Sequence, residues 1–145
     1  MVAPEGSTAP GRVIAFVLPE PTILLNPYLR THWTKRRKLQ LALAWSVRIA
    51  MAEQRQVIPP TPFARAVLRI ERHSVKSPDY DGMVGGFKML IDCLLPVTPR
   101  RPWGLGVLID DSPKFVTPDF PLPFLVRRAA ERRTVVRIQE MPITQ

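Results

Sequence analysis

The chain has 145 residues, which is enough for one domain with a hydrophobic core. Hydrophobic residues make up 46% of it, so its composition excludes an intrinsically disordered protein. The 21 lysines and arginines outnumber the 12 acidic residues and give a formal net charge of +9. This balance favours a polyanionic partner such as nucleic acid, although a merely basic protein of the ribosomal type would share it.

The single cysteine, Cys93, excludes an intramolecular disulfide and lies in an apolar run, where we expect a small core residue. No apolar run approaches the length of a membrane-spanning helix, so no membrane partner is expected. Residues 1–11 lack the charged-then-apolar pattern of a secretory signal and are expected to form a flexible tail before a single domain over 12–145. These features predict a reducing, intracellular setting, the cytoplasm.

The first predicted element is a strand over 13–18, an apolar run that ends at Pro19-Glu20-Pro21. A loop is expected over 22–34. It leads into a helix over about 34–54, with Thr34 as a plausible N-cap and apolar residues at helical spacing behind it.

The chain continues with a Pro-rich connector over 57–62. Residues 64–73 then alternate as in a half-buried strand, with Ala66, Leu68 and Ile70 on the inner side and a basic outer side. A second helix is expected over 83–95. Its predicted buried seam consists of Val84, Phe87, Ile91 and Leu94.

The last predicted elements are short. Residues 96–102 form a rigid basic loop, 114–117 an extended piece, 118–123 a Pro-rich irregular stretch and 133–141 the final strand. The resulting order, β-α-β-α-β-β, predicts an α/β fold in which a small mixed β-sheet is packed by two helices.

The six aspartates all lie between positions 79 and 119, whereas the six glutamates are scattered over the rest of the chain. Asp has the shorter, stiffer side chain, which suits fixing a metal ion. If the segment 79–81 is extended, Asp79 and Asp81 point to the same side. Two such carboxylates repel unless a cation accompanies them, and Mg²⁺ fits where a phosphate supplies further ligands. The alternative is a solvated turn after Ser77-Pro78.

Further candidates follow on the second predicted helix. Gly85, Lys88 and Asp92 are three and four residues apart and share one face, although Lys88 and Asp92 could simply form a surface ion pair. Gly85 and Gly86 cost a helix about 1 kcal/mol each relative to Ala, which indicates the close approach of a backbone or a phosphate.

Asp110 and Asp111 follow an apolar run and would by themselves indicate only a turn. Together with Asp79 and Asp81 they suggest a metal site. The two histidines, His32 and His73, have no metal-ligand spacing, so neither is expected to bind zinc.

Basic residues gather before and within the start of the first predicted helix. Cations at a helix N-terminus oppose the helix dipole, so we expect a partner that compensates them, and helix N-termini bind phosphate. The alternative is a solvated basic turn with Trp33 in the core. The candidate DNA-binding residues are Arg30, His32, Lys35, Arg36, Arg37 and Lys38.

Three separated segments follow one known pattern in order. They are Asp79-Tyr80-Asp81, then Gly85-Gly86-Phe87-Lys88 with Asp92, then Gly106-Val107-Leu108-Ile109-Asp110-Asp111-Ser112-Pro113-Lys114. These residues resemble the core of the RusA family of Holliday junction resolvases, and the segment 25–36 resembles the N-terminal part of its phage-type members. The resemblance covers about 13–116. Two departures are Gly82, where the family usually has Asn, and the seven-residue spacing between Asp81 and Lys88.

The resemblance implies a homodimeric, Mg²⁺-dependent endonuclease of DNA recombination and repair that resolves four-way junctions by paired nicks. By position, Asp79, Asp81 and Asp111 would be the essential acids that hold Mg²⁺, and Lys88 the essential basic residue. Asp92 and Asp110 match lesser positions of the family. Three alternatives stay open, namely a nuclease for other branched DNA, a catalytically impaired basic DNA-binding protein and an RNA-binding protein.

Overall fold

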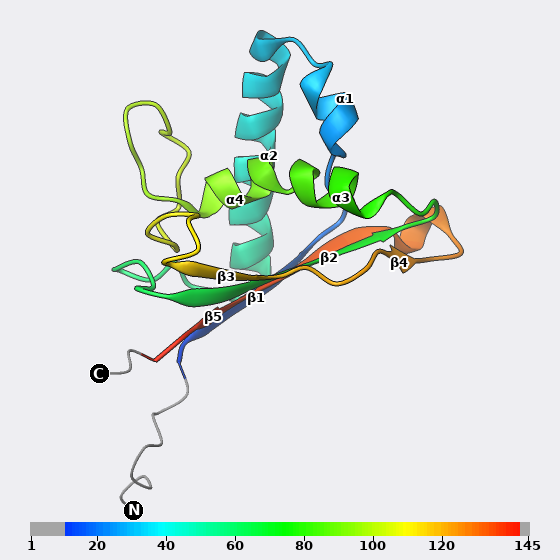
Figure 1. Ribbon diagram of the computed structural model, residues 1–145. Coiled ribbons are helices and arrows are strands. Elements are labelled where there is room, and N and C mark those ends of the chain that lie inside the picture. Colours follow the sequence, from blue (N-terminus) through cyan, green and yellow to red (C-terminus); the bar gives the residue numbers. More distant parts are fainter. Residues whose placement is uncertain (1–10, 143–145) are drawn as a thin grey trace, which may run out of the picture.

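The computed structural model describes residues 11–142, so of the tail predicted over 1–11 only Gly11 lies within the described residues. Five strands form one mixed β-sheet, and the helices lie on one side of it (Figure 1). The predicted α/β class is therefore confirmed. Within 11–142, none of the helices combines the length and the apolar character needed to cross a membrane.

The strands pair in the order β1-β5-β2-β3, and β4 also pairs with β2. Strands β1 (Val13–Leu18) and β2 (Ala66–Ser74) both run antiparallel to β5 (Arg133–Glu140), which lies between them. Strands β3 (Val116–Asp119) and β4 (Phe124–Leu125) run parallel to β2. A parallel pair requires a crossover connection, and two helices between β2 and β3 provide it.

The helices are α1 (Leu25–Leu29), α2 (Trp33–Glu53), α3 (Tyr80–Gly86) and α4 (Lys88–Leu94), with a 3₁₀ turn at Ala129–Glu131. Helix α2 stands steeply on the sheet, whereas α3 and α4 follow one another above it (Figure 1). The core fills the space between these helices and the sheet. Its large, fully buried side chains include Phe16, Val47, Met51, Phe63, Leu68, Phe87, Leu90 and Ile138.

The predicted alternation of the second strand is confirmed, because Ala66, Leu68 and Ile70 are fully buried in β2. The first half of the chain differs from the prediction in two details of its helices. Helix α1 lies inside the predicted loop over 22–34. The N-cap of α2 is His32, whose Nδ1 accepts a hydrogen bond from the Thr34 backbone N–H at 3.3 Å, so the prediction of Thr34 as N-cap is wrong by two residues.

The second predicted helix begins three residues earlier than expected and is divided at Phe87 into α3 and α4. It begins early because the Asp79 side chain accepts a hydrogen bond from the Gly82 backbone N–H at 2.8 Å and caps the first turn. The buried seam is also partly different. Phe87 and Leu94 are buried as predicted, but Val84 and Ile91 are only partly buried.

A chain of ion pairs lies along the outward residues of β2. Glu71 accepts hydrogen bonds from Arg69 Nε at 2.8 Å and contacts His73 Nε2 at 3.0 Å, and Arg69 Nη1 also contacts Asp119 at 3.0 Å. Burial alone would raise the pKa of Glu71, but the hydrogen bonds from Arg69 and His73 outweigh it and lower the pKa below its usual value.

Glu71→Gln is therefore expected to destabilise the protein by about 1 kcal/mol at pH 7, since a partly exposed charged hydrogen bond contributes about that much. A lowered pKa in the folded state contributes stability above the unfolded pKa and loses it as the pH falls through the folded value. The difference in the free energy of unfolding between Glu71→Gln and the wild type should thus disappear below about pH 4. Urea unfolding at several pH values measures it, and a gap that persists unchanged at pH 3 would contradict this account.

Candidate functional site

The first two predicted acids lie at the start of α3. Asp79 is its N-cap and Asp81 lies in its first turn, and both side chains are exposed. Because the helix begins directly after Asp79, the segment 79–81 is not extended, and the condition under which both carboxylates would point to the same side is not met. One carboxylate oxygen of Asp79 is engaged by Gly82. Among the described residues, Asp81 has no ion-pair partner.

Lys88, Asp92 and Asp111 form a second group. Lys88 Nζ lies 3.7 Å from Asp92 Oδ1, and the two side chains are 62% and 22% exposed. Burial raises the pKa of Asp92. The charges of Lys88 and Arg101 oppose this rise, and the charge of Asp111 adds to it. Asp111 is thus near enough to act electrostatically on Asp92, and Arg101 completes the cluster from the basic loop.

The two groups are linked by the near continuity of α3 and α4. Phe87, between them, keeps helical backbone angles, with φ −72° and ψ −11°. Asp81, Lys88 and Asp92 are seven and four residues apart, a spacing that places them on one side of such a helix. At 1.5 Å per residue, Asp81 and Lys88 are about 10 Å apart along the axis. The arrangement is therefore a line of charges along one helix side.

The segment after Asp111 is held against these helices by Phe120. The Tyr80 hydroxyl donates a hydrogen bond to the Phe120 carbonyl at 2.6 Å, and the Phe120 ring meets the Phe87 ring edge-on at 5.1 Å. Asp111 and Phe120 both line a cavity of about 190 Å³ that Ile91 of α4 also lines. Tyr80 and Phe120 were not predicted as site residues. The sequence feature that could have indicated Tyr80 is its position between Asp79 and Asp81.

The donor chemistry of the acids suits a hard divalent cation, but within 11–142 no three carboxylate, histidine or cysteine side chains are gathered so that they could hold a metal ion. Asp81 and Asp111 are exposed carboxylates, and Asp79 has one oxygen free of the capping bond. Mg²⁺ is commonly held by one or two carboxylates, with the remaining positions filled by water and substrate phosphates. Asp79 and Asp81 can supply such carboxylates at the start of α3, whereas Asp111 lies with Asp92 of α4, so the described residues do not gather all three acids at one point.

Close packing explains the two glycines of α3, and at Gly86 the neighbour is a backbone, as predicted. A Cβ added at Gly86 would lie 1.9 Å from the Ile23 carbonyl oxygen, and one at Gly85 would lie 2.7 Å from Leu25 Cδ2. Gly86 therefore faces the backbone that leads into α1, and Gly85 faces the Leu25 side chain of α1. This contact fixes α3 against α1.

The predicted DNA-binding residues divide into structural and free members. Arg36 donates to the carbonyls of Thr31 and Leu29 at 2.7 and 2.6 Å and stacks on the Tyr28 ring, so it holds the turn between α1 and α2. His32 is engaged as the N-cap of α2. Both residues therefore have structural roles at this corner.

Arg30, Lys35, Arg37 and Lys38 are exposed, and the Arg37 guanidinium lies 5.7 Å from the centre of the Trp103 ring. Trp33 is 69% exposed. The alternative that placed Trp33 in the core is therefore wrong, and an exposed aromatic side chain stands among exposed cations at this corner.

Cys93 is fully buried, as predicted. Burial raises the pKa of its thiol to about 12, and Gln40 Nε2 contacts the sulfur at 3.0 Å. The thiol stays protonated at neutral pH, which fits a core residue.

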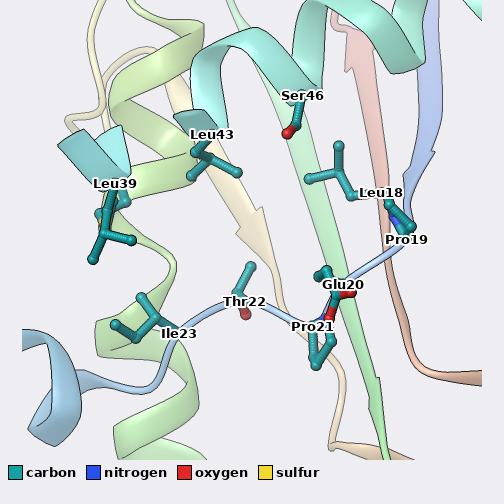
Figure 2. Close-up of a pocket in the computed structure, with 10 residues that line it drawn as sticks. Leu18, Pro19, Glu20, Pro21, Thr22, Ile23, Leu39, Leu43 and Ser46 are labelled. Atoms are coloured by element: carbon teal, nitrogen blue, oxygen red, sulfur yellow. The ribbon is translucent and has the colours of Figure 1, made fainter. Parts of the chain in front are cut away.

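An apolar pocket of about 180 Å³ lies elsewhere, between α2 and the segment that follows β1. Leu39, Leu43 and Ser46 extend from α2 toward that segment (Figure 2). The buried Thr22 hydroxyl, which also lines the pocket, has no hydrogen-bond partner among the described residues. None of the predicted catalytic or DNA-binding residues lines this pocket, so it is separate from the charged site.

No family model, curated protein or solved structure matches this chain.

Proposed function

We propose that the protein is a Mg²⁺-dependent, structure-selective DNA endonuclease that resolves four-way junctions by paired nicks. The observation that carries the proposal is the line of Asp81, Lys88 and Asp92 along one side of α3 and α4, with Asp111 beside it. These charges lie on a protein with a net charge of +9, which suits a polyanionic substrate.

In this proposal Asp79, Asp81 and Asp111 would hold Mg²⁺, which would supply Lewis acidity at a scissile phosphodiester. Lys88 neutralises the charge that develops on the phosphate and orients the attacking water. Its ammonium group suits this role because it is exposed and has only one carboxylate, that of Asp92, within ion-pair distance among the described residues. Asp92 fixes the direction of the Lys88 side chain.

The exposed cations at the start of α2 would hold the DNA arms. No described carboxylate forms an ion pair with any of these cations, which are Arg30, Lys35, Arg37 and Lys38. Phosphate contacts of this kind release counterions, so junction binding should weaken steeply as salt is added.

The proposal is tested by incubating the protein with labelled four-way, three-way and linear DNA, each with and without Mg²⁺. We expect paired nicks in the four-way junction only when Mg²⁺ is present. Cleavage of forks or flaps alone would favour the alternative branched-DNA nuclease. Mg²⁺-independent binding without any cleavage would favour a non-catalytic DNA-binding protein, and equal competition by RNA would favour an RNA-binding protein.

Lys88→Ala is expected to lower the rate of junction cleavage by about 10²-fold, since a group that stabilises transition-state charge contributes on that order. Junction affinity should change little. Lys114→Ala removes an exposed lysine outside the line of charges and serves as the control. If Lys88 only formed a surface ion pair, both variants would cut at the wild-type rate in single-turnover assays.

An apolar stripe on the outer side of α2 supports the homodimer that the RusA resemblance implies. Leu41, Trp45 and Ile49 stand at four-residue spacing and are 44%, 66% and 42% exposed. A second copy packed antiparallel about a two-fold axis would cover both stripes.

Trp45→Glu is expected to convert a two-chain particle into a one-chain particle, because it places a charge in the middle of this stripe. Sedimentation equilibrium measures the mass. Trp33→Glu is the matched control, since Trp33 is equally exposed but lies outside the stripe. A wild-type protein that sediments as one chain would contradict the proposed dimer.

A further inference from the structure

Arg72 is a buried cation without a counter-charge. It is 9% exposed, and it lies on the same inner side of β2 as Leu68 and Ile70, because these residues are two positions apart along the strand. Its Nε donates to the Thr22 carbonyl at 2.9 Å and its Nη1 donates to Ser74 Oγ at 2.9 Å. Within 11–142, Nη2 makes no hydrogen bond and no carboxylate forms an ion pair with the guanidinium.

A buried charge of this kind is costly unless something compensates it. The neutral oxygens of Thr22 and Ser74 orient the guanidinium but leave its charge uncompensated. Burial accordingly lowers the pKa of Arg72. A bound anion would supply the missing counter-charge.

Arg72 lines a cavity of about 510 Å³ that can admit such an anion. Lys76 and Arg132 also line it, and no described carboxylate pairs with either cation. Three basic residues and two serines thus line the cavity, and the Ser74 hydroxyl accepts from Arg72 Nη1 and donates to the Lys76 carbonyl. This composition suits a tetrahedral phosphate group, whose oxygens each accept several hydrogen bonds.

The cavity also adjoins the proposed catalytic acids. Pro78 lines it, and Asp79 follows directly in the chain. In Figure 1 this is the end of the molecule at which β2 ends, α3 begins and the turn at Ala129–Glu131 lies. A phosphate held here would lie on the side of Asp79 away from the line of charges along α3 and α4.

We propose that the cavity around Arg72, Lys76 and Arg132 binds a non-scissile phosphate of the DNA backbone and sets the register of the cut strand relative to Asp79 and Asp81. Phosphate contacts position a protein on DNA without reading its sequence. The identification of the phosphate as part of DNA rests on the proposed function, whereas the affinity of the cavity for phosphate does not.

The first arm of the test uses inorganic phosphate as the probe. Melting temperatures are compared in phosphate and in chloride at equal ionic strength, because a ligand that binds the folded state raises the melting temperature. Phosphate also raises the melting temperature through a general salt effect, which is common to all variants. The difference between variants in this rise therefore reports binding at the cavity. We expect the phosphate-specific rise to be lost in Arg72→Gln and reduced in Lys76→Gln and Arg132→Gln.

The second arm measures binding of fluorescent duplex DNA without Mg²⁺ as a function of salt. Each lost phosphate contact lowers the slope of log affinity against log salt by about 0.9. We expect that loss in Arg72→Gln and Lys76→Gln. Arg65→Gln is the matched control because Arg65 is an exposed arginine directly before β2 and outside the cavity. Its slope and its phosphate effect should equal those of the wild type.

Equal phosphate effects in all variants, or unchanged salt slopes in both Arg72→Gln and Lys76→Gln, would overturn the proposal. Lys76 and Arg132 are exposed, so their variants keep the test decisive even if Arg72→Gln fails to fold. Since neither arm requires cleavage, a lost slope in a protein that cuts no junction would uphold the phosphate site and reject the nuclease.

Discussion

Asp81→Asn is expected to lower the rate of four-way junction cleavage by about 10³-fold. The substitution keeps the size and shape of the side chain but removes the negative charge that attracts a divalent cation. A metal ion contributes several kcal/mol to the stabilisation of transition-state charge, and about 4 kcal/mol corresponds to 10³-fold in rate. Single-turnover cleavage of labelled junctions measures the loss.

The fold and the DNA affinity should survive this change. Asp81 is exposed and makes no ion pair among the described residues, so only its favourable interaction with the α3 dipole is lost, about 0.5 kcal/mol. Asp119→Asn is the control, because Asp119 lies outside the line of charges and pairs with Arg69. Equal cleavage by wild type, Asp81→Asn and Asp119→Asn would remove Asp81 from the mechanism.

Gly86→Ala is expected to destabilise the protein by about 3 kcal/mol, the upper end of the usual cost of overpacking. The added Cβ would lie 1.9 Å from the Ile23 carbonyl oxygen, and a backbone atom cannot move aside as a side-chain end can. Either α3 or the segment before α1 must shift. Because α3 carries Asp81, any variant that still folds should also cut junctions more slowly.

Gly85→Ala provides the matched control in the same helix. Its added Cβ meets the Leu25 side chain rather than a backbone carbonyl, and the substitution also gains about 1 kcal/mol of helix propensity. We expect it to be markedly less destabilising than Gly86→Ala in urea unfolding. Equal effects of the two substitutions would show that the contact between Gly86 and Ile23 is not the constraint that we describe.

The long elements of the fold could be predicted because their patterns are strong. The apolar run of β1 ends at prolines, β2 alternates, and α2 carries more than five turns of helical spacing. Helix α1 has only five residues and no buried residue, so it left no periodic signal. The two-residue strand β4 exists through its pairing with β2, which no local pattern encodes.

The candidate site was predicted by residue type but not in its geometry. Asp79 and Asp81 would share one side only in an extended segment, whereas Asp79, as a preferred N-cap residue, begins helix α3 there. The effect of Arg101 and Asp111 on Asp92 depends on how the loop over 95–112 folds back, which is a tertiary property. For Arg72 a signal was present, since it stands in phase with the inward residues of β2.

The central claim is that Asp79, Asp81 and Asp111 share one divalent cation. Substoichiometric Mn²⁺ tests it directly, because the ion broadens nearby amide signals in the NMR spectrum of the ¹⁵N-labelled protein. We expect broadening around all three acids, with Asp81→Asn abolishing it at Asp111 and Asp111→Asn abolishing it at Asp81. Broadening that persists at each acid when the other is replaced would mean separate sites and would contradict the account.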